Sequence, residues 1–281
     1  MDNRNNLKVS LIIAVYKDIE ALDLIFQALK NQTYKNFEVI VVEDNNSDEM
    51  KYFLASVEGL DIKHTFHEDL GIRKTRSINN GILVSEGEYL IFIDGDCIPY
   101  STFIESHVRL AEPGYVVSGR RVNLGPAYSE KLRNKSLSPA QLEKSYLLRY
   151  PLIAIDAIEK HAEAGIRFSP DSLYYKLVIK NKKKNVGLLG CNYSCFKKDM
   201  LSINGYDEGY PESSLGDDTD LEWRFKGFGL KIKSAKNIAN QFHLYHKRTS
   251  RGDEGLARDM KKMIANQENQ RFYCELGVDK H

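Results

Sequence analysis

Three apolar runs in the first hundred residues end abruptly in polar or acidic side chains. They lie at residues 8–15, 37–42 and 88–93, and β-branched and aromatic residues are prominent in each run. Runs of this length and composition are typical of strands buried on both faces. The second run is followed by Glu43-Asp44 and the third by Asp94-Gly95-Asp96. Because ligands of open α/β sheets bind at the carboxyl ends of strands, these acids mark a candidate site.

Segments with apolar residues at helical spacing connect these runs. Residues 19–30 fit a helix between the first two strands, and residues 73–84 fit another before the third. A strand, a helix and a second strand form a βαβ unit, which makes the sheet parallel at that point. With a further short strand at residues 62–66, the sequence predicts an α/β fold. Its single Rossmann-like sheet is mixed but mostly parallel, and helices flank it.

The character of the chain changes after residue 122. Residues 123–185 are punctuated by prolines and predict a helical insertion, with helices at about 139–148 and 154–164, after a strand at 115–122. Four lysines between Lys180 and Lys184 are typical of a solvated loop or of a loop that closes over a diphosphate. Within one domain of 281 residues, we expect a nucleotide-binding half (1–122), this insertion (123–185), an acceptor and catalytic half (186–248) and a C-terminal helix (249–281).

Overall composition narrows the class of function. The 40 basic and 39 acidic residues leave a net charge of +1, which argues against bulk binding of nucleic acid. Residues 1–6 lack the apolar core of a signal peptide, and no apolar run approaches the roughly 18 residues of a membrane-spanning helix. The four cysteines form no C-x-x-C pair and are expected to be buried, reduced thiols. We therefore expect a cytoplasmic protein.

Acids and histidines in the last third of the chain join the acids at residues 94–96 as candidates for one site. They are the pairs Asp217-Asp218 and His243 with His246. A divalent cation balances clustered carboxylates and holds the phosphates of a ligand, and imidazole ligands favour Mn²⁺ over Mg²⁺. Residues three apart point to opposite faces of a strand, so both histidines reach one ion only from a turn. Taken alone, Asp-Gly is also a common turn sequence, and a single histidine is more often a packing residue.

The order and spacing of these motifs resemble family-two glycosyltransferases of the GT-A fold, over residues 7–124 and 186–248. The C-terminal third also resembles the galactosyltransferase-type segment of animal β-1,4-galactosyltransferases and bacterial chondroitin polymerases. Each motif is short, but the ordered set is specific. The matching motifs are residues 9–16, 41–48, 71–73 with 79–82, Asp94-Gly95-Asp96, Gly190-Cys191-Asn192, Gly205-Tyr206-Asp207-Glu208, residues 216–221 and His243-Leu244-Tyr245-His246.

The resemblance implies a role for each matched residue in binding a metal and a UDP-sugar. Asp96 would ligate the metal, Mn²⁺ or Mg²⁺, together with His246 and His243. Asp217 would hydrogen-bond the donor sugar, and Asp218 would be the catalytic base. The residues that would bind the nucleotide and the donor are Ala14, Val15, Tyr16, Asp44, Arg73, Asp94, Gly95, Asp96 and Gly190.

The chemistry of glycosyl transfer explains these implied roles. Cleavage of the glycosyl–phosphate bond builds negative charge on the departing diphosphate, which a cation stabilises. The attacking acceptor hydroxyl loses a proton, which a positioned carboxylate accepts. One base and no second nucleophilic carboxylate imply a single displacement with inversion. Two departures leave the donor sugar open: Asp217 replaces the usual glutamate, and Ser213-Ser214-Leu215 replaces a tryptophan that often precedes the acid pair.

The implied partners are a UDP-sugar, such as that of galactose or N-acetylgalactosamine, and a glycan or lipid-linked glycan acceptor in the synthesis of a surface polysaccharide. Nucleic acid is not an expected partner. The acceptor class is compatible with peripheral association at the inner face of a membrane, and the oligomeric state is left open.

Two other functions are compatible with parts of the sequence. Asp94-Gly95-Asp96 after a strand also resembles the nucleophile motif of haloacid dehalogenase-type phosphohydrolases, and residues 216–220 resemble their late metal motif. In those enzymes the late acids follow an apolar strand, whereas here they follow Glu212-Ser213-Ser214-Leu215. The second alternative is a module that binds a sugar nucleotide without turnover.

Overall fold

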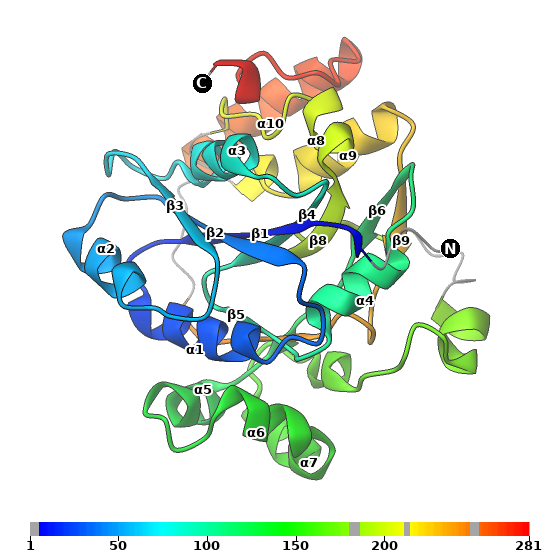
Figure 1. Ribbon diagram of the computed structural model, residues 1–281. Coiled ribbons are helices and arrows are strands. Elements are labelled where there is room, and N and C mark those ends of the chain that lie inside the picture. The colour runs from blue at the N-terminus through cyan, green and yellow to red at the C-terminus, as the bar shows by residue number, and fades with distance from the viewer. Residues whose placement is uncertain (1–5, 180–185, 211–213, 248–252, 281) are drawn as a thin grey trace.

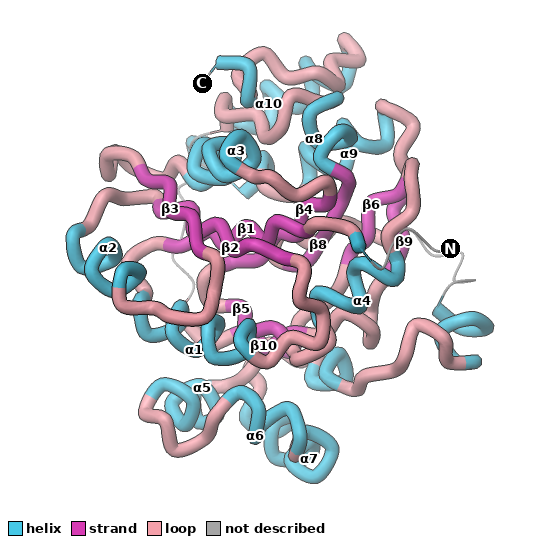
Figure 2. Tube along the Cα trace, viewed as in Figure 1, coloured by secondary structure: helices cyan, strands magenta, loops and turns pink. Residues whose placement is uncertain are grey.

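Two layers of helices cover the faces of a seven-stranded sheet, and a three-stranded sheet lies beside it (Figure 1). A computed structural model describes residues 6–179, 186–210, 214–247 and 253–280. Figure 2 shows the strands of the large sheet crossing the centre of the molecule between the helices. This arrangement confirms the predicted α/β fold.

The large sheet is mixed but mostly parallel, as predicted. In order across the sheet, its strands are β3 (Ile62–Phe66), β2 (Phe37–Glu43), β1 (Val9–Val15), β4 (Tyr89–Asp94), β8 (Asn192–Phe196), β6 (Tyr115–Ser118) and β9 (Lys231–Ser234). Strands β3, β2, β1 and β4 run parallel to one another, so their carboxyl ends meet at one edge. Strand β8 is antiparallel to both β4 and β6, and β9 is parallel to β6.

Alternate residues of the central strands face two separate hydrophobic cores. In β1, Leu11 and Ile13 pack into one core and Ile12 packs into the other, as a strand covered on both faces requires. The helices that line the first core include α1 (Ile19–Lys30), α2 (Asp48–Ala55) and α4 (Phe103–Leu110). Those that line the second are α3 (Lys74–Val84), α8 (Lys197–Ser202) and α9 (Thr219–Gly227), with η5 (Val278–Lys280) at its margin.

The remaining helices include α10 (Asp253–Glu268), which ends well before residue 281, the predicted limit of the C-terminal helix. Figure 1 shows α10 on the same side of the sheet as α8 and α9. Among the described residues, no helix combines the length and the apolarity needed to cross a bilayer.

The insertion folds into more and shorter helices than the sequence predicted. They are α5 (Pro126–Arg133), α6 (Pro139–Lys144), α7 (Tyr146–Asp156) and the short helices η2 (Ala162–Gly165) and η3 (Tyr175–Ile179). The predicted helix over residues 154–164 is wrong. The carboxylate of Asp156 instead accepts hydrogen bonds from the amides of Ala127 and Tyr128 at the start of α5, and Lys160 and His161 adopt left-handed backbone angles. The lysines at 180–184 lie outside the described residues.

The predicted strand over residues 115–122 is divided between two sheets. After β6 the chain turns at Gly119, and β7 (Val122–Asn123) joins the small sheet with β5 (Cys97–Pro99) and β10 (Gln241–His243). An added Cβ at Gly119 would lie 2.3 Å from the side chain of Asn192, so only glycine allows this turn to pass β8. The turn directs residues 120–123 towards the carboxyl end of β4, because β10 pairs with both β5 and β7.

Strand β8 was not predicted, because two of its five residues are polar. Both polar residues are buried and hydrogen-bonded. Ser194 Oγ lies 2.7 Å from Tyr89 Oη and 2.7 Å from His107 Nδ1, and Asn192 Oδ1 lies 3.1 Å from His107 Nε2. Burial lowers the pKa of His107 to about 3, so the imidazole is neutral. Satisfied polar groups of this kind are tolerated in a core, and they hide the strand from an apolar pattern.

A buried ion pair joins two turns of α9 to the loop after α8. Asp220 Oδ2 lies 2.6 Å from Arg224 Nε, neither side chain is exposed to solvent, and Arg224 Nη1 also donates to the carbonyls of Ile203 and Gly205. Removing one charge leaves the other buried and unpaired. We expect Asp220→Asn to lower the free energy of unfolding by about 3–5 kcal/mol in urea titrations.

The surface pair of Arg271 with Glu275 is the control for this prediction. It has the same i, i+4 spacing, and both side chains are more than half exposed. We expect Arg271→Ala to change the free energy of unfolding by less than about 0.5 kcal/mol. Equal effects of the two substitutions would contradict a structural role for the buried pair.

Candidate active site

The loop after β4 packs tightly against the carboxyl end of β1. The amide of Gly95 donates to the carbonyl of Ala14 at 2.7 Å. A Cβ at Gly95 would lie 3.0 Å from that carbonyl oxygen and 3.1 Å from Val15 Cα. Glycine at position 95 therefore holds the two strand ends together, and Asp94 and Asp96 lie on either side of the contact.

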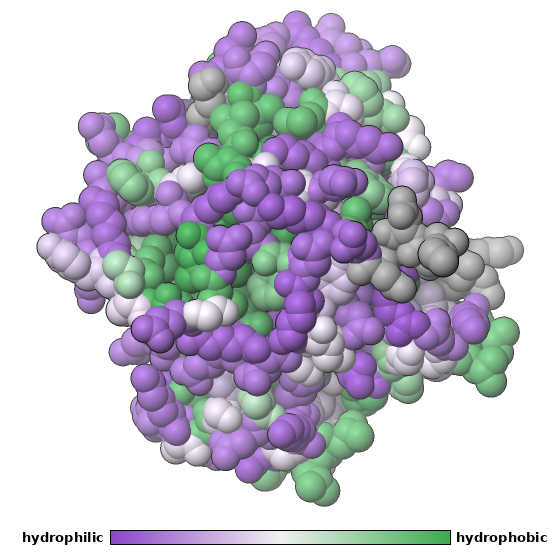
Figure 3. Space-filling view, viewed as in Figure 1, coloured by the Kyte–Doolittle hydropathy of each residue, from purple (hydrophilic) through white to green (hydrophobic). Residues whose placement is uncertain are grey.

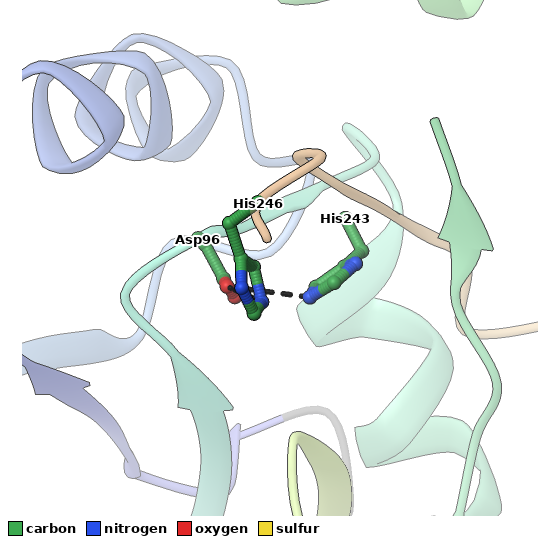
Figure 4. Close-up of side chains that lie close together, drawn as sticks. All are labelled: Asp96, His243 and His246. Atoms are coloured by element: carbon green, nitrogen blue, oxygen red, sulfur yellow. Dashed lines mark ion pairs between the residues drawn. The ribbon is translucent and has the colours of Figure 1, made fainter. Parts of the chain in front are cut away.

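Asp96 meets both histidines of the C-terminal third (Figure 4). Its Oδ2 lies 3.2 Å from His243 Nε2 and 3.4 Å from His246 Nε2, and one ligand atom from each of the three residues fits within 4.8 Å. His243 is the last residue of β10, and its strand partner is Cys97. The chain leaves the strand after His243, so the alternation of strand side chains no longer applies to His246. This confirms the expectation that a turn is needed to bring both imidazoles together.

The donor atoms of this cluster suit a divalent ion. One carboxylate with two imidazoles is a mixed oxygen and nitrogen ligand set, which Mn²⁺ accepts. Burial alone would raise the pKa of Asp96, but its hydrogen bond to His243 and the nearby side chains of His246 and Arg121 outweigh burial and hold that pKa at about 2. The carboxylate is therefore ionised and ready to bind a cation. A hollow of about 50 Å³ adjoins the two histidines, and its other lining residues are Arg121, Asn123, Leu124, Glu159 and Tyr245.

A second group of polar side chains lies at the ends of β1 and β2. The amide of Asp44 donates to the carbonyl of Val15, and Asp44 Oδ2 accepts from the amide of Arg73 at 2.9 Å. Burial raises the pKa of Asp44, and its Oδ1 has no hydrogen-bond partner, although His67 Nε2 lies 3.4 Å away. A buried acceptor without a partner is costly, so Asp44 is suited to a ligand that brings a hydrogen-bond donor.

Tyr16 and Arg73 adjoin the backbone contacts of Asp44, since Val15 and the Arg73 amide bond to it. Tyr16 is 52 % exposed, and its hydroxyl bonds to Asp69 and Lys17. The guanidinium of Arg73 bonds to the Glu68 carbonyl and lies 3.1 Å from His67 Nδ1. An exposed aromatic ring beside a buried acid and a guanidinium can stack on a planar base and bind polar or anionic groups.

Lys74 links the acid at the end of β4 to the acid pair before α9. Its Nζ lies 2.8 Å from Asp94 Oδ1 and 3.3 Å from Asp217 Oδ2. Burial would lower the pKa of Lys74, but the two carboxylates raise it well above its ordinary value, so the ammonium stays charged. One cation thus joins the N-terminal half of the site to the C-terminal half.

Asp218 lies beside the loop that begins β8. The backbone amide of Gly190 hydrogen-bonds Asp218, and an added Cβ on Gly190 would lie 3.6 Å from Asp218 Cβ. Burial raises the pKa of Asp218, the charge of Asp217 raises it further, and the Gly190 amide and Lys74 oppose that rise. A carboxylate with a raised pKa accepts a proton more readily, as a general base must.

Asp218 also lines an open hollow of about 440 Å³. Trp223 lines the same hollow, and its ring packs 4.9 Å from that of Phe272. The other lining residues are Leu188, Thr219, Glu222, Lys226 and Met263. Trp223 therefore packs on Phe272 and also borders the hollow that Asp218 lines.

The structure brings the residues singled out in the sequence to one edge of the sheet, through the contacts described above. It adds three that the sequence did not single out: His67, Lys74 and Arg121. Arg121 Nη1 donates to Cys191 Sγ at 3.3 Å, and its charge helps to lower the pKa of Asp96. Lys74 had a signal, because it opens the predicted helix of residues 73–84 at the edge where the acids gather. Arg121 had none, because it lay inside the predicted strand of residues 115–122.

Comparison with known proteins identifies two matching family models. Residues 10–171 match the model of glycosyl transferase family 2, and residues 178–247 match a model described as the N-terminal domain of galactosyltransferase.

Among curated proteins, the chain is 26 % identical over 207 residues to the GalNAc(5)-diNAcBac-PP-undecaprenol beta-1,3-glucosyltransferase of Campylobacter jejuni, which covers 72 % of this chain and 60 % of that protein. It is 33 % identical over 122 residues to glycosyltransferase AglE of Haloferax volcanii, covering 41 % of this chain and 37 % of that protein. The chain therefore spans less than two thirds of the length of these relatives.

Among solved structures, the chain resembles a mannosyltransferase from Pyrobaculum calidifontis in complex with GDP-Man and Mn²⁺, with a TM-score of 0.57 and 14 % identity over 94 % of this chain and 65 % of that one. It also resembles S. aureus TarS 1-349 in complex with UDP, with a TM-score of 0.60 and 14 % identity over 98 % of this chain and 68 % of that one. These structures have the GT-A fold, which this chain shares.

Proposed function

We propose that this chain, which belongs to glycosyl transferase family 2, moves a hexose from a UDP-sugar to a hydroxyl of a glycan or lipid-linked glycan. The transfer inverts the configuration at the anomeric carbon. The observation that carries the proposal is the convergence of Asp96, His243 and His246 at the carboxyl end of β4. Membership of the family removes the phosphohydrolase alternative. Galactose and N-acetylgalactosamine are the candidate sugars, because residues 178–247 match a galactosyltransferase model.

The three-residue cluster is the proposed metal site. When bound there, Mn²⁺ or Mg²⁺ supplies Lewis-acid stabilisation of the negative charge on the departing diphosphate. The solved structure with Mn²⁺ supports a metal in this fold, and the one with UDP supports the nucleotide.

The residues at the ends of β1 and β2 are the proposed nucleoside site. The unpartnered Oδ1 of Asp44 accepts a hydrogen bond from the uracil or the ribose, and the exposed ring of Tyr16 packs against the base. Ala14, Val15 and Gly95 form the backbone wall beside them, since Gly95 hydrogen-bonds Ala14 and packs on Val15. Arg73 provides positive charge near the phosphates.

Asp218 is the proposed catalytic base. It takes the proton of the acceptor hydroxyl as that oxygen attacks the anomeric carbon, and the hollow beside Trp223 receives the acceptor. Asp217 and Asp94 hydrogen-bond the donor sugar, and Lys74 holds these two carboxylates in place. Gly190 lies against Asp218, where a side chain would enter the space of the sugar.

The pH dependence of transfer is expected to report on this arrangement. The base acts when it is deprotonated, so kcat/KM should fall as the pH drops through the raised pKa of Asp218. Asp217→Asn removes a neighbouring negative charge, lowers the pKa of Asp218 and moves this acid limb to lower pH. Lys74→Met removes a positive charge, raises that pKa and moves the limb to higher pH.

Opposite shifts from the two substitutions distinguish an electrostatic effect from general damage to the site. They are measured as pH profiles of kcat/KM at saturating metal. Acid limbs that coincide in the wild type and both variants would contradict the role of Asp218 as base.

Detection of the nucleoside diphosphate released from a panel of UDP-sugars and GDP-mannose, with Mn²⁺ and with glycan acceptors, tests the proposed reaction. We expect UDP release from one UDP-hexose that depends on the acceptor, and a product of inverted anomeric configuration by NMR. Binding of UDP without release from any sugar nucleotide would instead identify a binding module without turnover.

A further inference from the structure

The solvent-facing side of α7 is apolar throughout. The residues of this helix that are exposed are Leu147, Leu148, Pro151, Leu152, Ala154 and Ile155. The exposed fractions of Leu148 and Ile155 are 87 % and 82 %. A helix on the surface of a soluble protein ordinarily turns charged and polar residues to water, so α7 has the reverse of the usual pattern.

The polar residues of α7 point inward or along the helix. Arg149 Nε donates to Ser145 Oγ, and the carboxylate of Asp156 caps α5. The exposed aliphatic side chains continue beyond the helix at Ile158. In Figure 3, hydrophobic groups gather at the lower edge of the molecule, where Figure 1 places α7. Contiguous apolar surface of this kind marks a site that binds a protein or a membrane.

The exposed charges of the described insertion are mostly positive. Residues 123–179 hold eight Lys and Arg against six Asp and Glu, and the basic residues are the more exposed of the two groups. Among the described residues of this segment, the exposed basic side chains are Lys131, Lys135, Lys144, Lys160, Arg167 and Lys176, and the exposed acids are Glu130 and Asp171. An apolar helix face bordered by cations is the composition of helices that lie in the interface of anionic membranes.

We propose that α7 and its basic surroundings dock this chain on the surface of a bilayer that contains anionic lipid, with Leu148, Leu152 and Ile155 inserted among the headgroups. A second copy of the chain fits less well, because a self-complementary interface would bring these cations against one another.

A residue just after α7 connects the docking face to the proposed metal site. Glu159, three residues after the end of α7, lines the same hollow as His243 and His246. Docking therefore holds the site near the membrane surface. The docking surface rests on the proposed function in one respect: a lipid-linked acceptor would present its sugar at the membrane surface.

Vesicle flotation with the full chain tests the proposal. The vesicles contain phosphatidylcholine, with or without about one third phosphatidylglycerol. We expect the wild type to float with the anionic vesicles and to be released by high salt. Leu148→Ser combined with Ile155→Ser should weaken this binding by about tenfold or more, and Lys144→Glu with Lys160→Glu should weaken it on anionic vesicles only.

Leu201→Ser combined with Leu256→Ser is the matched control. These leucines are exposed on α8 and α10, which Figure 1 shows on the opposite side of the molecule from α7, and the change should leave flotation unaltered. Stabilisation of each variant against heat by UDP with Mn²⁺ reports separately on the nucleotide site. If the wild type floats but UDP does not stabilise it, the proposed function fails and the docking surface stands.

Three outcomes would overturn the proposal. Equal flotation of the Leu148→Ser/Ile155→Ser variant and the wild type would exclude α7 as the docking element. A wild-type dimer that does not float, and that the same substitutions dissociate in light-scattering measurements, would assign the face to a second copy. A wild-type monomer that does not float would exclude the membrane as the occupant.

Discussion

Asp218→Asn is expected to lower kcat for sugar transfer by about 10²- to 10⁴-fold and to leave the affinity for UDP nearly unchanged. Asparagine keeps the size of the side chain and an oxygen that can accept from the Gly190 amide, but its neutral amide cannot take a proton from the acceptor. Because Asp218 lines the hollow beside Trp223 and is absent from the Asp96 cluster, nucleotide binding should survive. Turnover is measured by UDP release, and binding by calorimetry with UDP and Mn²⁺.

Asp61→Asn, at an exposed position before β3, is the matched control and should keep ordinary activity. Ordinary turnover of Asp218→Asn would remove Asp218 from the mechanism. Asp217 would then be the remaining candidate, since Asp220 is fully buried in its pair with Arg224.

Asp96→Ala is expected to abolish metal-dependent binding of the nucleotide. The substitution removes the only carboxylate of the three-residue cluster and leaves two imidazoles, so we expect Mn²⁺ affinity to fall by about 100-fold or more. UDP affinity measured with Mn²⁺ should fall to the value measured in EDTA, whereas affinity in EDTA should change little. His243→Ala should act in the same direction, because Nε2 of His243 is the imidazole nitrogen nearer to Asp96 Oδ2.

His161→Ala is the control for the histidine substitution, because His161 is exposed and lies outside the cluster. Electron paramagnetic resonance of Mn²⁺ measures metal binding directly, without activity. Unchanged Mn²⁺ binding in both Asp96→Ala and His243→Ala would show that other residues hold the ion.

The first half of the fold could be predicted almost residue by residue, because local sequence decides it. Helix α1 spans the predicted residues 19–30 and β3 the predicted 62–66. Within each of these elements the apolar residues follow either the helical or the strand spacing, and short turns separate the elements. Strand β8 and the short strand β7 could not be predicted, because their form depends on partners that are distant in the chain, such as His107 for β8 and His243 for β7.

The candidate site was predictable where chemistry is concentrated in short motifs. Asp96, His243 and His246 were proposed as metal ligands, and the structure brings them together. The sequence alone could not decide whether both histidines reach one ion, because it did not show where β10 ends. Lys74 was not singled out, because a lysine beside an arginine at the start of a helix is ordinary in a sequence. Its importance depends on two carboxylates that come within reach only in the folded chain.

Heat denaturation of the protein with UDP, GDP, ADP and CDP, each with and without Mn²⁺, tests the central claim most directly, because a ligand that binds only the folded state raises the midpoint Tm. We predict that UDP with Mn²⁺ raises Tm, that the other diphosphates have smaller effects, and that Asp96→Ala removes the contribution of Mn²⁺. A Tm that responds to none of the nucleotides, or equally to UDP with and without Mn²⁺, would contradict a metal-dependent UDP-sugar site at the end of β4.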